Sequence, residues 1–166
     1  MANRKLLTAQ EVIDLTGTRT NLQANFIDPH IEDAQEEHLE EVLTSPLYEE
    51  LITELNAATF SANNQILYDK YVKKYLAQMI LHYALVFIQY DIADKGVRVN
   101  EDPEDTSRPT GTKEFTLLRE SIRSNAGTKY RKLIKELTEN QDKYPSYTPE
   151  SDTPDKVTVN AGIIIH

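Results

Sequence analysis

The chain has 166 residues and a formal net charge of −9, with 39% hydrophobic and 27% charged residues. This composition is typical of a soluble globular protein with a core of its own. The sequence has no cysteine, which excludes disulfides, thiolate catalysis and zinc sites that need sulfur. The acidity disfavours nucleic-acid binding by charge, and residues 1–10 carry no secretory signal pattern. The most apolar stretch, residues 79–88, has the length of a buried helix core and not of a membrane span, so we expect no membrane partner.

The charge is distributed unevenly along the chain. Between Thr20 and Asp69 there are eleven acidic residues and no lysine or arginine. Residues 113–143, by contrast, contain eight basic and five acidic side chains. We therefore expect one acidic and one basic region on the folded molecule.

The N-terminal part predicts a short helix and a connection. Thr8 and Glu11 have the spacing of a capping box, which predicts a helix that begins beside them and ends near Gly17. Residues 18–27 are expected to form a polar connection.

Two proline signals then predict two further helices. Asp28 and Pro29 predict a helix start with Asp28 as the N-cap, and Ser45 and Pro46 predict that one helix ends and another begins there. Apolar residues at helical spacing support both helices. In the first helix they are Ile31, Ala34, Leu39, Val42 and Leu43, and in the second they are Leu47, Leu51, Ile52 and Leu55.

Two long helices are expected next, over residues 63–93 and 112–141, joined by a loop over 94–111. The first should be enclosed in its middle because it is apolar nearly all round. Gly127 lies within the second helix, where glycine costs about 1 kcal/mol relative to alanine and allows a bend. The predicted core face of the first helix is Tyr68, Val72, Tyr75, Met79, Tyr83, Val86 and Tyr90. That of the second is Phe115, Leu118, Ile122, Ala126, Leu133 and Leu137.

The C-terminal tail differs from the rest of the chain. Residues 144–155 contain three prolines and should be extended, and residues 157–165 alternate with the period of a strand. A lone strand lacks partners for its backbone groups. We expect this arm to add to another subunit through Val157, Val159, Ala161, Ile163, Ile164 and Ile165. The alternatives are pairing with residues 97–99 of the same chain or a frayed tail.

No motif for catalysis or nucleotide binding is present, and we expect no enzyme activity and no cofactor. His30 and His38 have carboxylates nearby, which suggests a metal site as an alternative. Their rings should lie roughly 12 Å apart along one helix, too far to share an ion. His82 is expected in the core or at an interface, and the tyrosines of residues 68–90 are expected to pack rather than to stack on bases.

The predicted acidic helix is the main candidate site. Six acidic residues place like charges at i,i+4, which is unfavourable by a few tenths of a kcal/mol per pair, on the order given for exposed helices. These residues are Glu32, Asp33, Glu36, Glu37, Glu40 and Glu41. The face is either simply solvated, or meets a basic surface, or lines a passage for a polyanion. The candidate basic surface, in a neighbouring copy, is Arg119, Arg123, Lys129, Arg131, Lys132 and Lys135.

The order of these elements resembles the head–tail connector (adaptor) proteins of tailed bacteriophages, especially those of crAss-like phages of Bacteroidota. The resemblance is carried by residues 6–17 (LLTAQEVIDLTG), the acidic helix over 27–43, the segment 46–51 (PLYEEL), the two long helices and the extended tail. It implies a non-enzymatic virion protein of the neck, assembled in the host cytoplasm. Such subunits form a ring, commonly of twelve copies, that binds the portal protein and other neck or tail proteins. DNA passes through the ring only as cargo.

The expected fold is therefore mainly α, a helical bundle built on two long helices plus shorter N-terminal helices. We predict a bundle domain over residues 1–143 and an extended arm over 144–166, with a β-strand at 157–165. The alternative function is a small acidic helical module of bacterial origin that binds a basic protein. A metal-dependent enzyme using His30 and His38 is the remaining alternative.

Overall fold

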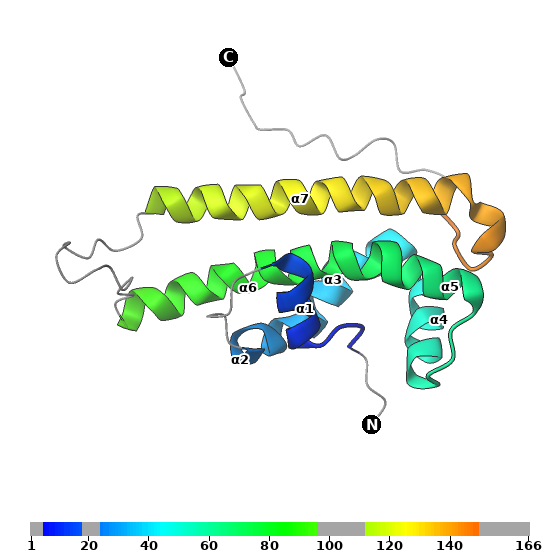
Figure 1. Ribbon diagram of the computed structural model, residues 1–166, viewed down its shortest axis with the longest axis horizontal. Helices are drawn as coiled ribbons and strands as arrows, with labels where there is room; N and C mark the ends of the chain where they lie inside the picture. The colour runs from blue at the N-terminus through cyan, green and yellow to red at the C-terminus, as the bar shows by residue number, and fades with distance from the viewer. Residues whose placement is uncertain (1–4, 18–23, 96–111, 150–166) are drawn as a thin grey trace, which may run out of the picture.

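The computed structural model describes residues 5–17, 24–95 and 112–149, and within these ranges the protein is mainly helical and contains no strand. Figure 1 shows α7 lying antiparallel along α6, with α1 and α2 on the side of α6 away from α7 and α3 crossing behind α6. The α-helices are α1 (Ala9–Thr16), α2 (Ala24–Ile27), α3 (Ile31–Leu43), α4 (Ser45–Asn56), α5 (Ala62–Leu67), α6 (Lys73–Lys95) and α7 (Thr112–Glu139).

The capping box predicted for the first helix is confirmed. The Glu11 backbone N–H donates to Thr8 Oγ1 at 3.2 Å, and the Thr8 N–H donates to Glu11 Oε2 at 2.9 Å. Gly17 ends α1 with φ of +65°, a conformation that favours glycine. The predicted polar connection is partly wrong, because α2 forms within it and Ile27 is buried.

The prediction that Asp28 caps a helix is wrong. Residues Asp28–His30 form a 3₁₀ turn, η1, and α3 begins only at Ile31 without a side-chain cap. The Asp28 carboxylate instead pairs with Lys5 Nζ at 2.9 Å. The Asp28 side chain, which the local sequence predicts to cap a helix, is bound by Lys5 from a distant part of the chain.

The predicted break before Pro46 is confirmed. Helix α3 ends at Leu43 and α4 begins at Ser45, so a single residue separates them. That residue, Thr44, has φ of +64° and ψ of 148°, which is a strained conformation for a β-branched side chain.

The first long helix is interrupted where the sequence predicts a regular one. A π-helical turn, η2 (Tyr68–Val72), joins α5 to α6. The wider turn directs Tyr68 to the N-terminal segment, where its hydroxyl bonds to Leu6, and Tyr71 to α7, where its hydroxyl donates to Glu136 at 3.1 Å.

Among the described side chains, the core confirms most of the predicted apolar faces. On the first long helix Tyr68, Val72 and Tyr75 are buried and Met79 and Tyr83 are half-buried, and the side chains of Val86 and Tyr90 lie outside the described residues. On α7, Ile122, Ala126, Leu133 and Leu137 are buried, and α7 continues through Gly127 without a break. Leu118, which we predicted to be in the core, is 48% exposed. The side facing α6 is occupied by Phe115 and Ile122, with Arg119 half-buried between them. Leu118 points about 40° away from Ile122 and about 60° away from Phe115 around the helix, which places it at the edge of the side that faces α6.

The bundle continues past the domain boundary predicted at residue 143. Tyr144 and Tyr147 are buried and belong to the main core. The Tyr144 hydroxyl donates to Glu136 at 3.1 Å, which fixes the segment after α7 to that helix. The predicted strand over 157–165 and the predicted short strand over 97–99 lie outside the described residues.

Candidate interaction surfaces

The six predicted acidic residues share the outward side of α3, which we call the acidic face. All are exposed except Glu40, which is half-buried. The opposite side of the helix carries the buried residues Ile31, Ala34, Gln35, Leu39 and Leu43. The apolar stripe therefore holds α3 against the bundle and leaves Glu32, Asp33, Glu36, Glu37, Glu40 and Glu41 toward the surface.

Within the described ranges, no lysine or arginine pairs with any carboxylate of the acidic face. The polar neighbours of these carboxylates include a hydroxyl group and an imidazole ring. Ser45 Oγ donates to Glu40 Oε1 at 2.9 Å, and His38 Nε2 lies 3.9 Å from Glu37 Oε1. The negative charge of this helix is thus left without a compensating basic side chain in the described bundle.

His30 and His38 both contact one tyrosine of α6. Their ring centroids lie 6.1 Å and 6.3 Å from that of Tyr83. Partial desolvation raises the pKa of Tyr83, and the nearby carboxylates of Glu37 and Asp33 raise it further. In the part of the chain that the structure describes, no three histidine, aspartate or glutamate side chains are grouped as metal ligands.

His82 lies on α6 and is close to residues of both α3 and α7. Burial lowers its pKa, and the charges of Arg119 and Arg123 and the neighbouring His38 lower it further, while the Arg119 backbone acts in the opposite direction. Its Nδ1 is buried and has no hydrogen-bond partner among the described residues. The neutral ring is therefore the favoured form in the folded protein.

The predicted basic residues lie on α7. Arg119 and Lys129 are half-buried, whereas the other four are exposed: Arg123, Arg131, Lys132 and Lys135. Lys135 Nζ lies 3.7 Å from Glu139 Oε1 on the same helix. Both α3 and α7 pack on α6, and His38 of α3 and Arg119 and Arg123 of α7 all act on the charge of His82. Within the described ranges, no ion pair joins these basic residues to the acidic face.

Three exposed apolar side chains accompany these charged surfaces. Leu117 and Leu118 on α7 are 54% and 48% exposed, and Phe26 on α2 is 36% exposed. Phe26 lies two residues before η1, which leads into α3. Each charged region thus has an exposed apolar group on or next to its helix.

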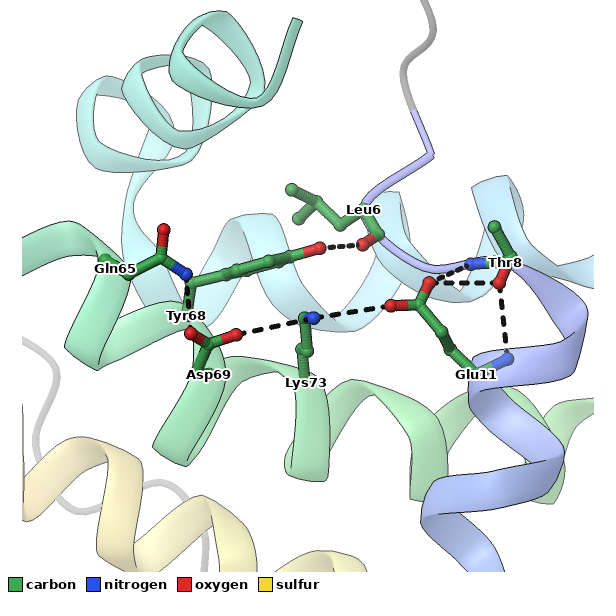
Figure 2. A network of polar contacts seen from close by, with 7 residues as sticks. All are labelled: Leu6, Thr8, Glu11, Gln65, Tyr68, Asp69 and Lys73. Carbon is green, nitrogen blue, oxygen red and sulfur yellow. Dashed lines mark hydrogen bonds and ion pairs between the residues drawn. The ribbon is translucent and has the colours of Figure 1, made fainter. Parts of the chain in front are cut away.

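Sequence reasoning missed a polar clamp on the N-terminal segment. The backbone N–H of Leu6 donates to Gln35 Oε1 at 2.8 Å, and Gln35 Nε2 donates to the Tyr48 hydroxyl at 2.6 Å. Figure 2 shows the Tyr68 hydroxyl donating to the Leu6 carbonyl. The one sequence signal for this clamp is Gln35, because a polar residue within the apolar stripe of α3 needs hydrogen-bond partners in the core.

A charged network surrounds this clamp (Figure 2). Lys73 Nζ lies 3.3 Å from Glu11 Oε1 and 3.3 Å from Asp69 Oδ1, and 4.6 Å from the centre of the Tyr68 ring. Burial acts to raise the pKa of Glu11, but its hydrogen bonds with Thr8 and the Lys73 ammonium hold that pKa below its ordinary value. These contacts join α1 to η2 and α6, and they stabilise the fold.

The predicted arm residues, Val157, Val159, Ala161, Ile163, Ile164 and Ile165, lie outside the described ranges. None of the described helices combines the length and apolar character needed to cross a membrane. No curated protein and no solved structure matches this chain. A family model does match residues 39–156, from the end of α3 through α7 and beyond. The chain belongs to the family of unknown function DUF6712.

Proposed function

We propose that the protein is a non-enzymatic structural subunit of a bacteriophage virion, a head–tail connector that forms a ring below the portal. The ring, of about twelve copies by the family resemblance, extends the DNA channel and joins the head to other neck or tail proteins. DNA is passing cargo and not a bound partner. The observation that carries the proposal is the acidic face of α3, which has no basic partner in the described bundle.

The acidic face supports an assembly role because a carboxylate row is unfavourable in isolation. Like charges at i,i+4 destabilise a helix by a few tenths of a kcal/mol per pair, on the order known for exposed pairs. A basic partner surface removes this repulsion. A channel wall instead uses it to keep a polyanion from adhering. A connector ring offers both environments.

The arm provides the second line of support. Tyr147 is buried in the bundle, so residues 148–156 form the connection to the proposed strand at 157–165. Nine residues in an extended proline-containing segment span about 28 Å. The described residues contain no strand to which residues 157–165 can add. We propose that the arm takes its backbone partners from a neighbouring subunit.

Deletion of residues 157–166 tests the proposal. We expect the full chain to form a ring, measured by light scattering after gel filtration and by electron microscopy. The truncated chain should keep its helical circular dichroism and become a monomer. The matched control is Thr158→Ala with Asn160→Ala, which keeps the apolar alternation and should still assemble.

Two results count against the proposal. A truncated protein that assembles like the full chain rules out the arm as the clasp. A full chain that stays monomeric at high concentration rules out the ring, and it favours a small acidic helical module that binds a basic protein.

A further inference from the structure

We propose that the acidic face of one subunit docks on the outward side of α7 of the next subunit. We define the outward side of α7 as Leu117, Arg131 and Lys135, which are all exposed. This inference rests on the proposed ring function and names the contact that repeats around the ring. It is distinct from the clasp made by the arm.

The outward side of α7 has the composition of a docking surface. At 100° per residue, Leu117, Arg131 and Lys135 point within about 40° of one another, and roughly opposite the buried Ile122 and Leu133. Leu117 is 54% exposed, so an apolar side chain stands on the same side of the helix as two cations. Interfaces combine apolar anchors with polar and arginine contacts, and here the anchor lies about 21 Å along α7 from Arg131.

The acidic face is the complementary surface. Its carboxylates have no lysine or arginine partner in the described ranges. Phe26, 36% exposed on the short helix before η1, places an apolar group near the start of the same region. Opposite charges across an interface steer association and set its register, and like charges across it are rejected.

The position of the two surfaces determines the kind of assembly. The two surfaces lie on different helices that both pack on α6, and within the described ranges no ion pair joins them in one subunit. Each copy then presents its acidic face to one neighbour and its α7 to the other. A contact of this head-to-tail type produces a closed ring when the rotation closes.

Charge-swapped variants of the full chain test the contact. Variant A carries Glu32→Lys and Glu36→Lys, and variant B carries Arg131→Glu and Lys135→Glu. Each variant alone then places like charges at the substituted positions of the contact. Variant A sets two lysines against Arg131 and Lys135, and variant B sets two glutamates against Glu32 and Glu36. We expect neither to form rings alone, and we expect an equimolar mixture to form rings in which the variants alternate. One chain carrying all four substitutions should assemble by itself.

The control for net charge is Asp14→Lys with Asp142→Lys, both exposed and outside the two surfaces. It changes the charge by the same amount as variant A and should assemble like the wild type. Assembly is measured by light scattering at low and at high salt, and raised salt should weaken the wild-type ring. Circular dichroism establishes that each variant is folded.

The results separate this contact from the proposed function. If the wild type assembles and variants A and B assemble equally well alone, the contact is wrong and the ring function stands. If A assembles alone but releases DNA poorly from particles, the acidic face lines the channel and the contact is again wrong. A folded mixture of A and B that stays monomeric also overturns it. A monomeric wild type overturns both proposals.

Discussion

The hydroxyl of Tyr68 donates a hydrogen bond to the backbone carbonyl of Leu6, 62 residues earlier in the chain. The N–H of the same Leu6 donates to Gln35 at 2.8 Å. Both backbone polar groups of one buried residue are thus satisfied by side chains from two different helical segments. This clamp holds the N-terminal segment in the bundle, where Leu6 and Leu7 are each 1% exposed.

Replacing Tyr68 by phenylalanine should therefore destabilise the protein. The variant leaves the buried Leu6 carbonyl without its donor, which costs about 1–3 kcal/mol in the free energy of unfolding. Urea denaturation followed by circular dichroism measures the loss. Tyr71→Phe is the matched control, because its partner Glu136 is half-buried and keeps the bond from Tyr144. An equal loss in both variants contradicts a special role for the Leu6 clamp.

Replacing Gln35 by leucine tests the other half of the clamp. The change removes the acceptor for the Leu6 N–H and a donor to the Tyr48 hydroxyl, both in the core. We expect a loss of about 1–3 kcal/mol in the free energy of unfolding, although leucine is the more apolar residue. The control Gln65→Leu, at an exposed site, should change stability by less than about 0.5 kcal/mol. A Gln35→Leu protein as stable as the wild type contradicts the assignment.

Gly127 is a site where the protein can be stabilised. It lies inside α7, and a Cβ added there meets no atom within 4 Å. Gly127→Ala should raise the free energy of unfolding by about 1 kcal/mol through better helix propensity. Gly17→Ala serves as the contrast, because φ of +65° makes any side chain unfavourable there. Thermal denaturation should move the two midpoints in opposite directions, and a fall for Gly127→Ala contradicts the prediction.

His82 predicts how stability depends on pH. Burial and the cations Arg119 and Arg123 lower its pKa in the folded protein. The unfolded chain then binds the proton more readily, so the free energy of unfolding falls as the pH drops below about 6.5. The contribution of the neutral His82 to stability is fully present above that pH, and it is lost as the pH falls through the lowered pKa of His82 in the folded protein.

The variant His82→Phe removes this titration, and its stability should change less than that of the wild type between neutral and mildly acidic pH. Arg123→Gln removes one of the two neighbouring cations. In this variant the free energy of unfolding should therefore decline less with falling pH than it does in the wild type. Urea denaturation across the pH range measures both. Identical pH profiles for the wild type and His82→Phe contradict the prediction.

The sequence by itself determined the helical class and most of the helix ends. The capping box of Thr8 and Glu11, the stop at Gly17 and the break before Pro46 all appear in the structure. These signals act between residues a few positions apart, so the local chain contains the whole cause. The acidic face could also be predicted from the sequence, because helical periodicity places its carboxylates on the side of α3 opposite the apolar stripe.

Only the tertiary structure decided what depends on partners far along the chain. Asp28 pairs with Lys5 and not with a helix end, and Gln35 holds Leu6 from within an apolar stripe. In the π-helical turn at Tyr68–Val72, the hydroxyl of Tyr68 bonds to Leu6 and that of Tyr71 bonds to Glu136 of α7. A local pattern contains no information about such partners, because the free energy of each contact arises only when distant segments pack together.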